Sequence, residues 1–287
     1  MTATSASPPS GSSEPTNAVL RVAAVQMSAQ DDVTRNLTEC ARLVGHARAA
    51  GAALVVLPEN FAYFGPESRR RELAETVGDA SAPIQRALSE MASAHGITIV
   101  AGGMPEKSDD RERPYNTCVV FDRRGERVAA YRKIHLFDVD LKDGTTLRES
   151  ASTAAGADAV VVAVGGFTIG LSICYDLRFP ELYRLLAKKG ADVIVVPAAF
   201  TVHTGKDHWH VLLRARAIES QAWVIAAAQW GKHPRGRSTY GHSMVVDPWG
   251  TIVGEASDRS TVVVADVDRG YLESVRASLP SLTHRKL

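Results

Sequence analysis

Three ionisable residues stand at or just past the ends of apolar segments, and their chemical types together suit the hydrolysis of an amide. They are Glu59 after 54–57, Lys133 after 128–131 and Cys174 after 167–173. A thiol attacks a carbonyl carbon, a carboxylate carries the thiol proton, and an ammonium stabilises the oxyanion that forms. Cys174 alone fits a buried hydrophobic cysteine better than a nucleophile. The other two segments are what favour catalysis.

The motifs that carry these residues are VVLPEN (55–60), YRKIHLFD (131–138) and ICYDLRFPEL (173–182). In this order they resemble the nitrilase superfamily of carbon–nitrogen hydrolases, and the resemblance runs from about residue 20 to 286. It implies that Glu59, Lys133 and Cys174 form a catalytic triad. It also implies that Glu149, in the segment LRES (147–150), is a second glutamate beside the lysine.

Each residue of this set has an expected role. Glu59 takes the thiol proton, returns it to the leaving amine and then activates water against a thioester. Lys133, together with the backbone N–H of Tyr175, holds the oxyanion. A buried ammonium needs a carboxylate partner to stay charged, and Glu149 is the candidate. The alternative for Glu149 is a solvated loop residue.

Two further residues are expected to bind substrate. Arg178 lies about one turn past Cys174, where its planar guanidinium suits a substrate carboxylate. A local pair with Asp176 is the alternative role for Arg178. Phe200, past the apolar segment 193–196, is placed at the pocket edge mainly by the resemblance.

A metal or another cysteine chemistry fits the chain less well. His203, His208 and His210 invite a zinc site, but 208 and 210 diverge on a helix and no third ligand stands at a suitable spacing. A Cys–His dyad would leave Glu59 and Lys133 unexplained. We therefore expect no metal and no cofactor.

The elements that position these residues alternate between apolar strands and amphipathic helices. Strands are predicted at 19–27, 54–57, 97–101, 116–121, 128–131, 159–164, 167–173, 193–196, 224–228, within 241–250 and at 261–267. Helices are predicted from Asp31 or Asp32 to about Ala50, over 83–96, from Pro180, over 207–221 and from about Tyr271. The core face of the helix 207–221 is predicted to consist of Trp209, Leu212, Leu213 and Ile218. The stretch 136–156 is predicted to be a long polar loop.

After residue 159 only two helices separate the strands, so a single doubly wound parallel sheet lacks crossovers. Two mixed sheets packed face to face fit better. The resemblance implies an α/β fold of this kind, a four-layer α-β-β-α sandwich flanked by helices, commonly paired as a homodimer or higher homo-oligomer.

Composition limits the remaining function classes. The 287 residues carry a net charge of +1, which offers no field for nucleic acid, and no apolar run reaches the length of a membrane span. The Ser/Thr/Pro-rich stretch 1–17 is expected to be a disordered tail without signal or transit features, and 18–287 a single domain of a cytoplasmic protein. Three widely spaced cysteines fit reduced thiols.

Within the superfamily, the segments 208–219 and 240–250 most resemble the deaminated glutathione amidases, except that His210 stands where those usually have Glu. This implies a small carboxylated amide substrate. The ω-amidases, which act on α-ketoglutaramate, are the close alternative, and a true nitrilase fits less well. A binding or scaffold protein without turnover is the alternative of a different class. The intact ionic set argues against it, because a silent site has no physical reason to keep buried charges.

Overall fold

The computed structural model describes residues 18–140 and 146–286. The predicted tail 1–17 therefore lies outside the described residues. The strands are β1 (Val19–Met27), β2 (Leu54–Leu57), β3 (Thr98–Glu106), β4 (Tyr115–Phe121), β5 (Arg127–Arg132), β6 (Asp138–Asp140), β7 (Thr146–Arg148), β8 (Val161–Val164), β9 (Phe167–Leu171), β10 (Val193–Ala198), β11 (Trp223–Lys232), β12 (Ser238–Tyr240), β13 (Met244–Val246), β14 (Ile252–Glu255) and β15 (Thr261–Asp268). The helices are α1 (Val33–Ala49), α2 (Glu67–Glu72), α3 (Pro83–His95), α4 (Pro180–Lys188), α5 (Val202–Ser220) and α6 (Arg269–Ser278), with short 3-10 turns η1 (Glu149–Ala151), η2 (Cys174–Arg178) and η3 (Pro234–Gly236).

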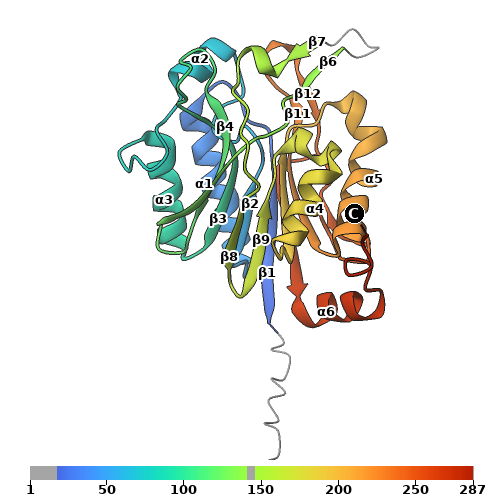
Figure 1. The fold of residues 1–287 in the computed structure, drawn as a ribbon. Coiled ribbons are helices and arrows are strands. Elements are labelled where there is room, and N and C mark those ends of the chain that lie inside the picture. Colours follow the sequence, from blue (N-terminus) through green and yellow to red (C-terminus); the bar gives the residue numbers. More distant parts are fainter. Residues whose placement is uncertain (1–17, 141–145, 287) are drawn as a thin grey trace, which may run out of the picture.

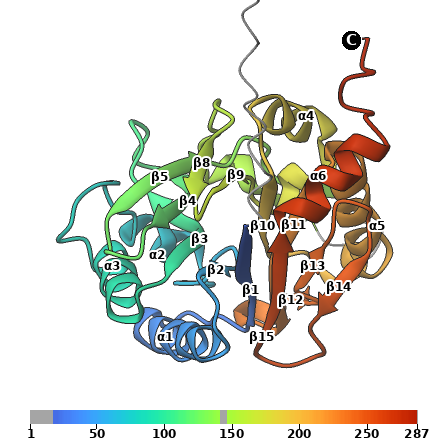
Figure 2. The same cartoon turned by 90° about the horizontal axis from the view of Figure 1, so that it is seen from below.

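The principal strands hydrogen-bond in the order β5-β4-β3-β2-β1-β11-β10-β9-β8. This continuous path bends on itself, so that the half beginning at β5 faces the half ending at β8 (Figures 1 and 2). Pairing is parallel around β1, β2, β10 and β11 and antiparallel toward both ends. β15 lies off this path and runs antiparallel along β1.

Close approach of the two halves depends on one glycine. A Cβ atom added at Gly102 of β3 would lie 1.9 Å from Cβ of Pro197 in β10. No side chain fits in that space, so the facing strands approach as closely as they do because residue 102 is glycine.

Helices cover the outside of each half, which gives the predicted α-β-β-α layers. In Figure 2, α1 and α3 lie on one side of the strands, and α4 and α5 lie on the other. Alternate residues of β1 serve different layers, because successive side chains of a strand point to opposite faces. Val22 and Ala24 belong to the core between the sheets, whereas Ala23 and Val25 pack with α1. The fold prediction is confirmed.

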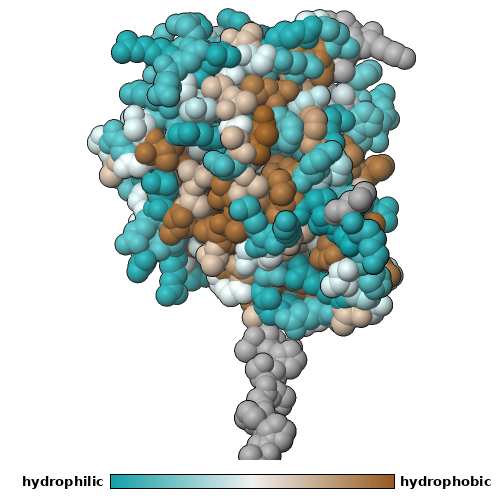
Figure 3. Space-filling view, in the orientation of Figure 1, coloured by the Kyte–Doolittle hydropathy of each residue, from teal (hydrophilic) through white to brown (hydrophobic). Residues whose placement is uncertain are grey.

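The surface is mostly polar, with one visible exception. On the face shown in Figure 3, apolar residues gather near the region where β8 and β9 lie in Figure 1, and polar side chains dominate elsewhere. Within the described residues, no helix has the length and apolar character needed to cross a membrane.

Three details of the sequence-based expectation were wrong. The stretch 136–156 is not structureless, since β6 and β7 form an antiparallel hairpin in it. These strands are three residues long and polar, so the sequence shows no alternation of apolar and polar residues that would predict them. Helix α5 begins at Val202, not Asp207. Ile218 is 45% exposed, because the buried stripe of α5 follows Trp209, Leu213 and Ala217 and Ile218 lies beside it.

Candidate active site

Cys174 begins the η2 turn directly after β9 in a strained backbone conformation. Its φ of 47° lies in the left-handed region, which a non-glycine residue adopts at a cost of about 1–3 kcal/mol. Asp176 holds the turn, because its carboxylate accepts the Ile173 N–H at 2.8 Å. The thiol is therefore presented by a turn that is fixed from within.

The same carboxylate ties the turn to the segment that follows β5. Asp176 accepts the Tyr131 hydroxyl at 2.6 Å and the His135 N–H at 3.0 Å, and its side chain is fully buried. Its oxygens are thus already used, and no ion pair joins Arg178 to Asp176 in the described part of the chain. Asp176 positions the nucleophile turn against the strand that carries Lys133, a role that the sequence analysis did not find.

Glu59 follows β2, and its main chain and side chain are both held. The Asn60 N–H donates to Gly103 O at 3.1 Å, and Gln229 Nε2 donates to Glu59 O at 2.9 Å. The residue is only 4% exposed. A buried carboxylate needs donors around it, and Asn116 Nδ2 supplies one at 2.9 Å from Oε1.

Lys133 follows β5 and joins the two glutamates. Its Nζ donates to Glu59 Oε1 at 2.9 Å and to Glu149 Oε2 at 2.8 Å, and the side chain is 2% exposed. Glu149 is fixed in turn by the Phe137 N–H, 2.7 Å from Oε2. Glu149 therefore lies beside Lys133 and is not a solvated loop glutamate.

These contacts set the charges of the cluster. Burial alone would lower the pKa of Lys133, but the charges of Glu149, Glu59 and Cys174 outweigh it and raise that pKa well above the ordinary value. Burial alone would raise the pKa of Glu149, and Lys133 reverses the shift so that the pKa falls. The Lys133 ammonium and the Glu149 carboxylate thus keep each other ionised although both are shielded from solvent.

The surroundings of Cys174 favour the neutral form of its thiol. Burial raises the pKa of Cys174 well above the ordinary value, the Glu59 charge adds to this, and Lys133 opposes it only in part. The Glu59 side chain and the Ala199 backbone both lie close enough to the sulfur to affect its pKa. Cys174 is therefore a protonated thiol at neutral pH and needs a base, and Glu59, which lines the same cavity, is the candidate.

Asn116 is a site residue that sequence reasoning missed. It lies near the start of β4, is 2% exposed, and its Nδ2 reaches Glu149 Oε1 at 3.4 Å as well as Glu59. Gly103 makes room for it, since a Cβ there would lie 2.7 Å from Asn116 Oδ1. The only sequence signal was an amide at the edge of an apolar strand.

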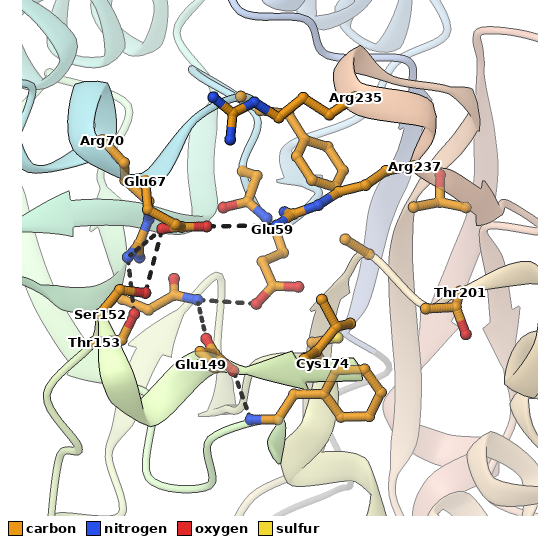
Figure 4. Close-up of a pocket in the computed structure, with 18 of the residues that line it drawn as sticks. Glu59, Glu67, Arg70, Glu149, Ser152, Thr153, Cys174, Thr201, Arg235 and Arg237 are labelled. Carbon is orange, nitrogen blue, oxygen red and sulfur yellow. Dashed lines mark hydrogen bonds and ion pairs between the residues drawn. The ribbon is translucent and has the colours of Figure 1, made fainter. Parts of the chain in front are cut away.

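Cys174, Glu59 and Lys133 line a cavity of about 550 Å³. Figure 4 shows how Glu59 and Cys174 lie among its lining residues. Aromatic rings of Tyr63 and Phe64 form part of its wall. Five cationic side chains and three carboxylates line it, a surplus of two positive charges with histidine neutral: Arg70, Lys133, Arg148, Arg235 and Arg237 against Glu59, Glu67 and Glu149. Such a cavity favours an anionic ligand.

Tyr175, Arg178 and Phe200 cluster with one another and are not among the residues that line this cavity. The guanidinium carbon of Arg178 lies 5.7 Å from the Tyr175 ring centroid and 5.2 Å from that of Phe200. Burial lowers the pKa of Arg178, and the charge of Cys174 opposes that shift. Arg178 is thus half-buried within electrostatic reach of the sulfur, and in the described chain it has no carboxylate partner.

The histidines of α5 separate, as their spacing predicts. His208 Nδ1 lies 3.2 Å from Arg178 Nη1, whereas His210 Nε2 lies 2.8 Å from Glu255 Oε1. His242 Nδ1 contacts that same oxygen at 2.6 Å. This second cluster involves none of the residues around Cys174, and both histidines already hydrogen-bond the one carboxylate.

The chain is similar to known proteins over most of its length. The carbon-nitrogen hydrolase family model matches residues 21–277. The chain is 46% identical to the deaminated glutathione amidase of Synechocystis sp. over 266 residues, covering 92% of this chain and 97% of that protein. It is 42% identical to the human protein of the same name, covering 92% and 82%. The crystal structure of Saccharomyces cerevisiae Nit3, a member of branch 10 of the nitrilase superfamily, superposes with a TM-score of 0.85 at 32% identity, covering 94% and 97%.

Proposed function

The chain belongs to the carbon-nitrogen hydrolase family, and from this premise we propose that it cleaves deaminated glutathione into 2-oxoglutarate and cysteinylglycine through a thioester at Cys174. The observation that carries the proposal is the contact set around Lys133, which joins both glutamates next to a protonated thiol. Each of the three chemical roles needed for amide hydrolysis has one residue in place.

In acylation, Cys174 Sγ attacks the amide carbonyl carbon while Glu59 accepts the thiol proton. Lys133 and the Tyr175 N–H stabilise the tetrahedral oxyanion. Glu59 then gives its proton to the amide nitrogen, the C–N bond breaks, and the amine leaves. Because the pKa of the thiol is raised, the proton transfer to Glu59 has to accompany the attack.

In deacylation, a water molecule replaces the amine. The water oxygen attacks the thioester carbon while Glu59 accepts a proton from the water. The second oxyanion forms where the first one did, beside Lys133 and the Tyr175 N–H. Collapse breaks the C–S bond, and the sulfur recovers the proton from Glu59. One water is consumed, and the chain returns to its starting protonation state.

Charge favours deaminated glutathione over the ω-amide alternative. The cavity has a surplus of two positive charges, and deaminated glutathione carries two carboxylates, one on each side of the scissile amide. α-Ketoglutaramate carries one. Arg178 stays the proposed partner of the 2-oxo acid carboxylate. It is half-buried near Cys174 and has no carboxylate partner among the described residues, although it packs against Phe200 and does not line the cavity.

The test is a comparison of both substrates on one preparation. Release of 2-oxoglutarate is followed, and kcat/KM for deaminated glutathione is expected to exceed that for α-ketoglutaramate by about tenfold or more. The reverse order moves the assignment to the ω-amidases. If neither is hydrolysed and mass spectrometry finds no acyl adduct on Cys174, the chain is a silent binding protein.

Two further expectations stay proposals. We propose a homodimer formed through helix α5, supported by Val211 and Ile218, which are 67% and 45% exposed on that helix. The cytoplasmic location expected from the sequence also stays a prediction.

A further inference from the structure

The mouth of the cavity carries charged groups that the triad does not use. Arg235 and Arg237 come from the η3 turn between β11 and β12, and Arg70 and Glu67 come from α2 on the opposite wall (Figure 4). Three guanidinium groups thus surround one carboxylate at the mouth.

The carboxylate of Glu67 forms no close hydrogen bond with the arginines around it. Its Oε1 lies 3.8 Å from Arg237 Nη2, and its Oε2 lies 4.0 Å from Arg70 Nη1. Both distances exceed a hydrogen bond, whereas Arg148, also at the cavity, pairs with Asp140 at 2.6 Å. Each guanidinium has five N–H donors, so most of those on Arg235 and Arg237 remain available to a second carboxylate.

The turn that carries the two arginines is anchored from below. The His233 ring is buried, with Nδ1 2.8 Å from Ala29 O and Nε2 2.7 Å from Thr239 Oγ1, and the His233 N–H donates to Arg237 O at 2.8 Å. Arg235 has a φ of 62°, a left-handed conformation that favours glycine. Arginine at such a position is a costly choice for a surface turn that only connects strands.

Arg70 differs from the other two. Its side chain is 9% exposed and its Nη1 donates to Thr153 Oγ1 at 2.9 Å. It also helps to lower the pKa of Glu149. Arg70 therefore belongs to the inner wall, and Arg235 and Arg237, both exposed, are the cations that a ligand meets at the mouth.

We propose that Arg235 and Arg237 bind the carboxylate at the far end of the leaving amine, which makes the enzyme selective for amides whose leaving group is a peptide with a free C-terminal carboxylate. This inference rests on the proposed function. The acyl part becomes bonded to Cys174, which is 8% exposed, so the amine is the part that must leave toward solvent. Its remote end lies at the mouth, where a planar guanidinium can take both carboxylate oxygens.

The test removes charge from the protein and from the substrate in turn. Arg235→Gln/Arg237→Gln is compared with the unaltered protein on deaminated glutathione and on its C-terminal glycinamide, in which the far carboxylate is neutral. The unaltered protein is expected to prefer the acid by about ten- to a hundredfold in kcat/KM, mostly through KM. The double variant is expected to lose that preference, so that kcat/KM for the acid falls to about the value for the glycinamide.

A matched control tests for unspecific charge effects. Arg86→Gln/Arg124→Gln removes two exposed arginines that do not line the cavity, and it is expected to keep the full preference. Equal slowing of the acid and the glycinamide by Arg235→Gln/Arg237→Gln would overturn the proposal, as would an unaltered protein without preference.

A binding measurement separates failure of this inference from failure of the proposed function. Calorimetry on Cys174→Ala, which cannot turn over, should show deaminated glutathione binding about ten- to a hundredfold more weakly when both arginines are replaced. If the unaltered protein lacks hydrolysis but this difference is found, the mouth site stands and the proposed reaction fails. Equal affinities, or no binding to either protein, overturn the mouth site.

Discussion

Asn116 Nδ2 lies 2.9 Å from Glu59 Oε1 and 3.4 Å from Glu149 Oε1, so that one buried amide spans both carboxylates that hold Lys133. Without it, each glutamate would lose a donor in a place from which water is largely excluded. The Asn116 amide therefore stabilises both carboxylates beside the single Lys133 ammonium, so that no second cation is needed.

Asn116→Leu is expected to lower kcat by about tenfold or more, because an unpaired Glu59 oxygen changes both the position and the basicity of the proposed base. KM should change little, since the amide does not contact substrate in the proposed mechanism. Steady-state kinetics measure both values. Ser220→Ala is the control, because Ser220 Oγ is also buried but has no hydrogen-bond partner among the described residues. A variant of Asn116 with unchanged kcat would contradict the positioning role.

Cys174→Ala is expected to abolish amide hydrolysis while the circular dichroism spectrum stays native. Cys40→Ala and Cys118→Ala provide matched comparisons, since both thiols are fully buried and burial raises both pKa values. They should retain activity and lose about 1–2 kcal/mol of unfolding free energy through the small voids created. Residual turnover in Cys174→Ala would refute the thioester route.

Lys133→Met is expected to reduce kcat at least about a hundredfold, since it removes an oxyanion donor. It also leaves Glu59 and Glu149 buried without their cation, so the unfolding free energy should fall by about 3–5 kcal/mol. Lys133→Arg keeps the charge and tests function with less risk to folding. A planar fork does not fit a place where three oxygens lie 2.8–3.0 Å from one nitrogen, so Arg should not restore kcat. Near-normal turnover would contradict this.

The stability contributed by Lys133 and Glu149 should depend on pH only at the extremes. The pKa of Glu149 is lowered below 4.5, so its contribution is present above about pH 4.5 and is lost as the pH falls through the folded value. The pKa of Lys133 is raised above 10.5, so its contribution is complete below about pH 10.5 and is lost above it. Denaturant unfolding of the unaltered protein and Lys133→Met/Glu149→Gln should differ by a constant amount between about pH 5 and 10. A steady change across that range would contradict the charge assignment.

If the proposed dimer forms through α5, Val211→Lys is expected to convert it to a monomer, because the substitution places a charge on the exposed face of that helix. Light scattering measures the mass. Val128→Lys, on β5 at 45% exposure, is the control and should leave the mass unchanged. A Val211→Lys protein with unaltered mass would rule out α5 as the dimer interface.

The strands that carry Glu59, Lys133 and Cys174 can be predicted from the sequence alone. The predicted bounds of β1 and β2 match the structure, because a short segment of mostly apolar residues is a local signal. Family resemblance supplied the chain order of the three motifs and the place of Glu149. Each of these inferences needs only residues that are neighbours in the chain.

The groups that complete the site depend on the folded arrangement of the chain. Asn116 meets Glu59 across 57 positions of sequence, and Asp176 meets Tyr131 across 45. Arg235 and Arg237 reach the cavity because β11 and β12 pair and project the turn over the mouth, while Arg178, though close in sequence to Cys174, packs against Phe200 instead. Such contacts follow from how the two halves of the sheet fold together. The periodicity of apolar residues along the chain does not predict which polar side chains become buried next to one another.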